Sequence, residues 1–400
     1  MDFTQYGLRK GFCSGDAFRR YLDSHYNREL GLCFPDQQYN IRLLYSLVSE
    51  CMEAYGRVAV VALDAVSCEY FLREIVPAGL DRMAWRSAIY TSVFPSTSTT
   101  AWASIMTGLS PEQHGIYGAS FRETVDGTAG SYVLRDDLFH TAAGSAPAKV
   151  PLICRPFSSI FERCRDAYSV FIGRMGINES NQLFQLLTRG VSQAVDPGLR
   201  EYLELKKHPS ELLRYVERES MQVLDCHREG RLLLWSFFDL DAYIHVNSYE
   251  PLAGQNLWER FAGWIQALSQ RTNAVLLLCD HGQTPQRQYK THLIDEIKAL
   301  PFSTVCLSGA GRVLYLYGNP KKLTHWAQER FGETAHIFRR EDLFDVGLLG
   351  KKAVKPERIG DVVLVAKNGA FQSFGERNLC EHGACSEDEL FVPCALYTPT

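Results

Sequence analysis

The chain has 400 residues, of which 46% are hydrophobic and 22% charged, a composition typical of soluble globular proteins. This length predicts one large domain with insertions, or two domains. Lys and Arg number 42 and Asp and Glu number 46, so the formal net charge is −4. A mildly acidic chain lacks the overall positive charge of a nucleic-acid binder. We therefore expect no extended nucleic-acid binding.

The first residues contain no apolar run long enough for a signal peptide. No stretch of about eighteen apolar residues occurs, so no membrane span is expected. The twelve cysteines are scattered, without a Cys-x-x-Cys pair. Together these features predict a cytoplasmic protein with reduced thiols. Cys380 and Cys385 flank a histidine, but core packing is favoured over metal binding for both.

In chain order, residues 1–56 precede the first clear strand and are expected to form an N-terminal extension. A single large domain is expected over residues 57–400. Short apolar runs rich in Val and Leu predict buried strands. They lie at Val58–Leu63, Leu232–Phe238, Ala274–Cys279, Val313–Tyr317 and Asp361–Val365.

Amphipathic patterns between these runs predict helices at Ser158–Arg165, Leu199–Glu229 and Leu257–Gln270. Residues 120–230 form a long interval that we expect to include a cap or insertion over the site. Within this interval, Thr124–Pro151 is rich in Gly and Ala without a sustained period, which predicts loop. Strands alternating with helices predict an α/β fold with a mainly parallel sheet flanked by helices.

Acidic and histidine residues follow three of the predicted strands. Asp64 follows the first, Asp239, Asp241 and His245 follow the second, and Asp280 with His281 follows the third. In an open parallel sheet, ligands bind beyond the carboxyl ends of the strands. One Asp after a strand is usually a turn or helix-cap residue. Three such strand ends with two histidines favour a metal site.

Carboxylate oxygen and imidazole nitrogen together suit zinc, with manganese as the second choice. Two such ions about 4 Å apart can hold the attacking and leaving oxygens of a phosphoryl displacement. A run of hydroxyl residues, Ser96 through Thr100, follows Pro95 and precedes an apolar stretch. The run is typical of a capped helix start, and a hydroxyl there would also lie near positive partial charge that favours an alkoxide and a phosphate.

The segment from Phe94 to Thr107-Gly108-Leu109-Ser110-Pro111-Glu112-Gln113-His114-Gly115-Ile116 closely resembles the type I phosphodiesterase and nucleotide pyrophosphatase branch of the alkaline-phosphatase superfamily. Three later segments fall in the family's order: Asp241-Ala-Tyr-Ile-His245, Asp280-His281-Gly282 and Glu381-His382-Gly383. The resemblance spans Arg57 to Pro393, although close matches occupy only these stretches. It implies that residues 57–400 form an alkaline-phosphatase-like catalytic domain.

The resemblance implies two divalent metal ions. One would be held by Asp64, the nucleophile, Asp280 and His281, and the other by Asp241, His245 and His382. The implied nucleophile is a hydroxyl that becomes phosphorylated. Counting nine residues back from Thr107 gives Ser98, and a one-residue shift gives Thr99, with Ser98 preferred. The implied substrate is a small phosphate ester, with a nucleotide among the candidates.

This sequence departs from the family pattern at two places. Ala101 stands where nucleotide pyrophosphatases have an Asn that helps bind the phosphoryl oxygen, and Ile244 replaces the usual Gly before the histidine. The core chemistry is therefore expected to carry over better than nucleotide specificity. Asp239 and His114 are expected to be structural, and Trp102 and Tyr243 to be packing residues.

Several activities stay open beside a phosphodiesterase. A phosphomonoesterase or a phosphoryl transferase would use the same site. A protein that keeps metal and ligand binding but has lost catalysis is the alternative of another class. A sulfatase is disfavoured because its Cys-x-Pro-x-Arg or Ser-x-Pro-x-Arg motif is missing at the expected place.

Overall fold

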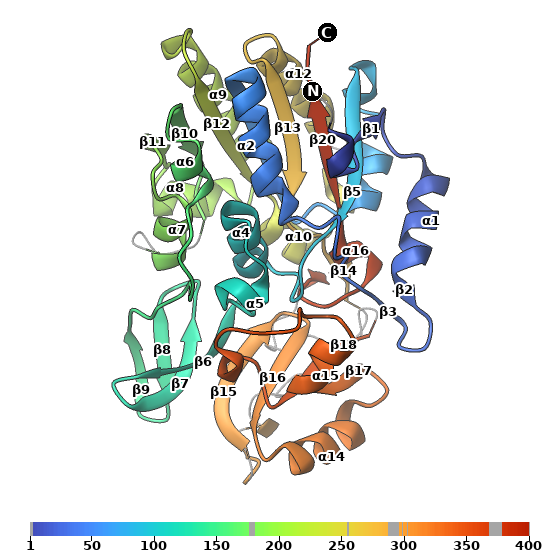
Figure 1. Cartoon of the computed structure of the whole chain (residues 1–400), viewed down its shortest axis with the longest axis vertical. Helices are drawn as coiled ribbons and strands as arrows, with labels where there is room; N and C mark the ends of the chain where they lie inside the picture. Colours follow the sequence, from blue (N-terminus) through green and yellow to red (C-terminus); the bar gives the residue numbers. More distant parts are fainter. Residues whose placement is uncertain are drawn as a thin grey trace.

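The computed structural model describes residues 3–175, 181–253, 256–286, 296–297, 299–301, 303–367 and 378–399. Two large sheets dominate this part of the chain, one above the other in Figure 1. The upper, main sheet is mostly parallel and covered by helices on both faces. The lower sheet is antiparallel. The predicted α/β class with a mainly parallel central sheet is confirmed.

Within the described residues the main sheet has eight strands in the order β1-β5-β20-β13-β4-β12-β10-β11. The five strands from β13 to β11 run parallel, whereas β20 is antiparallel to both of its neighbours. The strand bounds are β1 Arg9–Lys10, β5 Trp85–Thr91, β20 Phe391–Tyr397, β13 Ala274–Cys279, β4 Arg57–Asp64, β12 Leu232–Asp239, β10 Tyr168–Ile172 and β11 Gln193–Val195. The three central predicted strands are therefore neighbours, with β4 in the middle.

Helices bury their apolar faces against this sheet. Helix α2 (Leu43–Tyr55) packs on β4 and β13, and α9 (Pro209–Cys226) packs on β12 and β10. Helix α12 (Leu257–Ser269) packs on β13 and against α9, on the face opposite α2 (Figure 1). The single helix predicted over Leu199–Glu229 is divided, because α8 (Leu199–Leu205) ends before Pro209 begins α9. Proline lacks an N–H and suits a first helical turn.

The second sheet has the order β17-β18-β16-β15-β6-β7-β8-β9, again counted over the described residues, and all its pairings are antiparallel. The bounds are β17 Ala335–Arg339, β18 Val362–Ala366, β16 Val313–Gly318, β15 Ser303–Ala310, β6 Ser120–Val125, β7 Thr128–Val133, β8 Leu138–Thr141 and β9 Gly144–Pro147. The predicted strands near residues 313–317 and 361–365 thus exist, but they lie in this sheet and not in the main one.

The expectation of loop over Thr124–Pro151 is wrong, because this segment forms most of the meander β6 to β9. Its small residues permit close strand approach. A side chain at Gly130 would place its Cβ 2.4 Å from the carbonyl oxygen of His140 on β8. We predicted loop because apolar and polar residues do not alternate here. They do not alternate because the segment ends the sheet, and every residue of β9 is exposed.

Residues before 57 are joined to the main sheet. Strand β1 pairs with β5 at the edge, and α1 (Gly15–His25) packs its apolar residues next to Phe391 of β20. The short remaining elements are β2 Tyr26–Asn27, β3 Leu32–Cys33, α3 Cys68–Tyr70, α4 Ser98–Thr107, α5 Pro111–His114, α6 Ile160–Arg163, α7 Gln182–Leu187, α10 Asp241–Asn247, α11 Glu250–Ala253, β14 Thr284–Pro285, α14 Pro320–Phe331, α15 Arg340–Asp345, β19 Cys380–Glu381 and α16 Glu387–Leu390. None of the helices in the described ranges has both the length and the apolar character needed to cross a bilayer.

Candidate active site

The predicted site residues meet at the edge of the main sheet that faces the second sheet. Asp64 is the last residue of β4, and its register partner on β12 is Asp239. Asp280 follows β13 directly, and Asp241 begins α10 two residues after β12. The arrow of β13 points toward the second sheet in Figure 1. The parallel pairing of these three strands thus brings their acidic ends together.

One cluster, the first group, consists of Asp64, Asp280 and His281. One ligand atom of each lies within 4.8 Å of the others, and all three side chains are buried. Asp64 Oδ2 accepts a hydrogen bond from Trp102 Nε1 at 3.1 Å, and Asp280 Oδ1 accepts one from the Ala65 amide at 3.2 Å. Asp280 Oδ2 has no hydrogen-bond partner in the described chain and lies 3.3 Å from His281 Nε2. This group therefore directs the Oδ2 atom of Asp280 toward its interior, beside the imidazole of His281.

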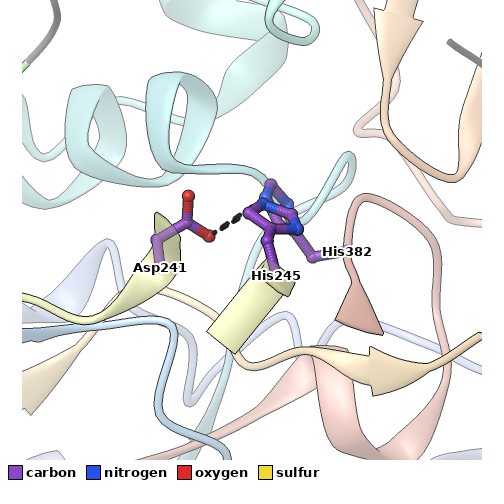
Figure 2. Close-up of side chains that lie close together, drawn as sticks. All are labelled: Asp241, His245 and His382. Atoms are coloured by element: carbon purple, nitrogen blue, oxygen red, sulfur yellow. Dashed lines mark ion pairs between the residues drawn. The ribbon is translucent and has the colours of Figure 1, made fainter. Parts of the chain in front are cut away.

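The second group consists of Asp241, His245 and His382, whose ligand atoms meet the same 4.8 Å criterion. His245 lies one helical turn after Asp241 on α10, so both side chains share one face of the helix. The Nε2 atoms of His245 and His382 are each 3.3 Å from Asp241 Oδ1. Figure 2 shows the two imidazoles turned toward this carboxylate.

The three histidines share one hydrogen-bonding pattern. Nδ1 of His281 lies 3.0 Å from the carbonyl oxygen of Gly282, that of His245 2.9 Å from Cys380 O, and that of His382 3.1 Å from Ser96 O. A carbonyl accepts, so Nδ1 carries a proton in each ring and Nε2 is the nitrogen available to a metal ion. Each Nε2 faces a carboxylate of its own cluster, which is Asp280 for His281 and Asp241 for His245 and His382. Such backbone support is typical of metal-binding histidines.

The hydroxyl of Ser98 faces the first group. Ser98 is the first residue of α4, and its Oγ lies 3.0 Å from His281 Nε2 and 3.5 Å from Asp64 Oδ1. The neighbouring hydroxyl, Thr99 Oγ1, donates to the carbonyl oxygen of Gly118 at 2.9 Å. Of the two candidates for the nucleophile, Ser98 is the one whose hydroxyl contacts the carboxylate and imidazole of this group.

The loop before α4 is joined to the loop that carries His382. Ser96 forms an antiparallel bridge with Gly383, and its Oγ donates to the carbonyl oxygen of Ala384 at 2.7 Å. Gly383 has a φ of +118°, and a Cβ there would lie 2.7 Å from the Cβ of Ala310, so this close approach requires glycine. The hydroxyl loop and the last histidine are thereby held in one unit.

Burial and like charge dominate the electrostatics of the first group. Burial raises the pKa of Asp64 well above its usual range, and the carboxylates of Asp280, Asp239 and Asp241 raise it further. Burial also raises the pKa of Asp280 to about 8. For His281, burial and then the charge of His382 hold the pKa well below its ordinary value. A bound cation would relieve this repulsion between ionised carboxylates.

The second group behaves as an ion-pair cluster. Burial alone would raise the pKa of Asp241, but His245 and His382 outweigh it, and the pKa is held well below its usual range. Burial would lower the pKa of His245, but Asp241 and then Glu381 outweigh it and raise the value to about 10. A metal ion bound here would replace protons on imidazole, since only the unprotonated nitrogen can coordinate.

The residues predicted to be structural have defined positions. Asp239 accepts from the Tyr202 hydroxyl of α8 and from the Asp241 amide, and lies 3.9 Å from Lys206 Nζ. His114 is fully buried below α4, where Nε2 lies 3.1 Å from Ser104 Oγ. Trp102 packs against Trp235 and Phe237, as expected, and also bonds to Asp64.

Three neighbours of the site were not identified from the sequence. Gln283 donates to Asp241 from Nε2, Glu381 lies 3.6 Å from His245 Nδ1, and Tyr202 reaches Asp239 from the 120–230 interval. Gln283 and Glu381 adjoin the Asp-His-Gly and His-Gly segments, which was the only sequence signal available for them. Tyr202 lies on a helix without any motif.

The donor set fits divalent metal ions. Six buried or partly buried side chains supply three carboxylates and three imidazoles, in two groups of three. The three Nε2 atoms face the group interiors, and so does Oδ2 of Asp280, which has no hydrogen-bond partner among the described residues. Three nitrogen or oxygen ligands with room for a further oxygen are typical of catalytic zinc sites. The groups are therefore two candidate metal-binding sites.

Comparison with solved structures shows the same fold. Phosphonoacetate hydrolase from Sinorhizobium meliloti, in complex with phosphonoacetate, superposes with a TM-score of 0.58 at 17% identity, over 86% of this chain and 90% of that chain. Murine ectonucleotide pyrophosphatase/phosphodiesterase 5 gives a TM-score of 0.56 at 14% identity, over 85% and 87%. The human counterpart gives 0.57 at 14% identity, with the same coverage.

No curated protein matches the sequence. The family model described as type I phosphodiesterase / nucleotide pyrophosphatase matches residues 58–384, which include every residue of both groups and the Ser98 hydroxyl. This match covers well over half of the chain. The protein belongs to the type I phosphodiesterase / nucleotide pyrophosphatase family.

Proposed function

We propose that this protein is a two-metal phosphate-ester hydrolase, a phosphodiesterase in which Ser98 is the nucleophile. The observation that carries this proposal is the position of the Ser98 hydroxyl. It lies at the N-terminus of α4, 3.0 Å from His281 Nε2 and beside the carboxylate of Asp64. Nucleophile and candidate metal ligands therefore share one small volume.

The chain would perform the reaction in two steps. Ser98 Oγ gives up its proton and attacks the phosphorus of the diester. The leaving oxygen departs with its bonding pair and takes up a proton, and the phosphorus, which still carries its second ester group, becomes bonded to Ser98 Oγ. A water oxygen then attacks the same phosphorus, and Ser98 Oγ leaves with its bonding pair and regains a proton. Two easier displacements replace one difficult step. Two divalent cations, when bound, would lower the pKa of the Ser98 hydroxyl and neutralise charge on the oxygens around phosphorus.

Backbone N–H groups at the start of α4 would bind the phosphoryl oxygens. A helix leaves its first N–H groups without intrahelical partners, and they favour anions. The side chain of Thr97, the residue before α4, does not accept a hydrogen bond from these N–H groups. Since Ala101 offers no amide side chain, these N–H groups would take a larger share of the binding than in relatives with Asn at that place.

Zinc is the proposed metal, with manganese as the second choice. Each group combines carboxylate with imidazole, and the second group has two imidazoles, a donor set that zinc prefers. The proposed substrate is a small phosphate ester, with nucleotides among the candidates. Its support is that one relative of this fold binds phosphonoacetate and an inactive variant of another binds AMP.

The test is zinc-dependent release of nitrophenol from bis-(p-nitrophenyl) phosphate and from p-nitrophenyl phosphate. Preference for the diester, lost in Ser98→Ala, is the expected result. Preference for the monoester would replace the proposal with a phosphatase or a phosphoryl transferase. Turnover unaffected by chelators would overturn the two-metal proposal. Metal binding without turnover of a broad set of phosphate esters would favour a protein that has lost catalysis.

A further inference from the structure

Gln283 connects the two candidate metal groups. It lies two residues after His281 of the first group and is fully buried. Its Nε2 donates to Oδ1 of Asp241 at 2.7 Å and to the main-chain oxygen of Asp241 at 3.0 Å. A residue of the Asp-His-Gly turn therefore holds a ligand of the other group.

The amide orientation follows from chemistry. Both atoms that Gln283 contacts on Asp241 are acceptors, so the donor end of the amide must face them. Its two N–H groups match these two oxygens. The opposite atom, Oε1, has no hydrogen-bond partner in the described part of the chain although it is buried. Leaving a buried acceptor without a donor costs free energy, which the two hydrogen bonds to Asp241 offset.

The main chain of Gln283 is fixed as well. Its amide donates to the hydroxyl oxygen of Tyr249 at 2.9 Å, and that hydroxyl donates to the carbonyl oxygen of Ala65 at 2.6 Å. Ala65 directly follows Asp64, and Tyr249 stacks on Tyr70 with ring centroids 4.6 Å apart. One chain of bonds thus runs from the residue after Asp64, through Tyr249 and Gln283, to Asp241.

We propose that Gln283 is a positioning residue that fixes the Asp241 carboxylate for metal binding and ties the geometry of the second group to that of the first. This inference rests on the proposed two-metal function. Asp241 Oδ1 is the atom on which His245 and His382 converge, so rotation of this carboxylate would disperse the whole second group. The first group has its own supports, which are the Trp102 indole and the Ala65 amide.

The test is a zinc titration of wild type and Gln283→Met, in which Met keeps the length of the side chain and removes the donor. Loss of such a support typically weakens metal affinity by about 10- to 100-fold. We expect one of two zinc dissociation constants to rise by that factor and the other to stay within about twofold. Gln266→Met, on the exposed face of α12, is the matched control and should change neither constant.

A second background identifies the affected site. His245→Ala removes a ligand of the second group and leaves the first group intact. Adding Gln283→Met to it should leave the remaining zinc affinity unchanged. If Gln283→Met fails to fold, as judged by circular dichroism, Gln283→Asn serves instead, since its shorter amide cannot reach Asp241.

The outcomes separate the two proposals. Two zinc ions bound with wild-type affinities by Gln283→Met would overturn the positioning role alone. Fewer than two zinc ions bound by wild type would overturn the two-metal function, and the positioning role with it. A selective loss at one site, absent from Gln266→Met and from the His245→Ala background, is the supporting result.

Discussion

The rings of His281 and His382 stack with centroids 4.1 Å apart and an interplanar angle of 26°, although they belong to different metal groups. The two groups are therefore in direct contact through these rings. His281 comes from the turn after β13, whereas His382 comes from a loop about a hundred residues later.

Metal removal is expected to lower both activity and stability. Without a cation, the buried carboxylates of Asp64 and Asp280 are costly to ionise, as their raised pKa values indicate. Zinc at 100 times its dissociation constant would stabilise the fold by about 2.7 kcal/mol per site. Differential scanning fluorimetry after chelation and after zinc return measures this. An unchanged Tm would contradict it.

Ser98→Ala is expected to reduce turnover by at least about 10³-fold, as loss of a nucleophile does elsewhere, while zinc stoichiometry stays at two. Thr99→Ala is the matched control. It removes a hydroxyl that donates to Gly118 O, so its kcat should stay within a few-fold of wild type. Steady-state kinetics with metal analysis decide between them. The reverse ranking would transfer the nucleophile to Thr99.

Trp102→Phe is expected to weaken zinc binding at the first group by about tenfold, because Asp64 Oδ2 loses its indole donor. The aromatic packing against Trp235 and Phe237 is kept. Trp264→Phe is the control, since the buried Trp264 indole nitrogen has no hydrogen-bond partner among the described residues. Competition with a zinc chelator gives both affinities. Equal effects in the two variants would assign the change to packing.

The buried pair of Glu123 and Arg358 predicts an acid-dependent stability. Burial would raise the pKa of Glu123, but Arg358, with Nη2 and Nε bonded to its carboxylate, outweighs burial and lowers it. A folded-state pKa below the unfolded value means that the pair stabilises above that value. This contribution is lost as the pH falls through the folded pKa.

Glu123→Gln should therefore cost about 3 kcal/mol of unfolding free energy at pH 7, because the guanidinium of Arg358 is fully buried. The deficit should shrink as acid protonates Glu123 in wild type. Urea unfolding at pH 7 and at a series of acid pH values, through the unfolded pKa of Glu123 and below it, tests both statements. Glu204→Gln, which breaks an exposed pair with Lys207, should leave stability nearly unchanged. A deficit independent of pH would refute the electrostatic explanation.

The α/β class with a mainly parallel sheet could be predicted from the sequence. The meeting of the acidic strand ends at one edge could be predicted as well, because parallel strands align their carboxyl ends. Asp64, Asp241 and Asp280 needed only that rule and the family motif to be placed. The sequence could not reveal Tyr202, whose contact with Asp239, the last residue of β12, depends on how α8 packs against α9. The β6–β9 meander could not be predicted either. Its strands contain small residues and pair through main-chain hydrogen bonds, which leave no alternation of apolar side chains in the sequence.

Strand β20 lies inside the main sheet, between β5 and β13. During synthesis on the ribosome, β5 and β13 emerge long before β20 does, so their facing edges remain without hydrogen-bond partners in the interval. Open strand edges invite pairing with other chains, and pairings between distant segments form slowly. Soluble yield in a recombinant host should therefore depend on growth temperature and on chaperones that protect these edges until the sheet closes.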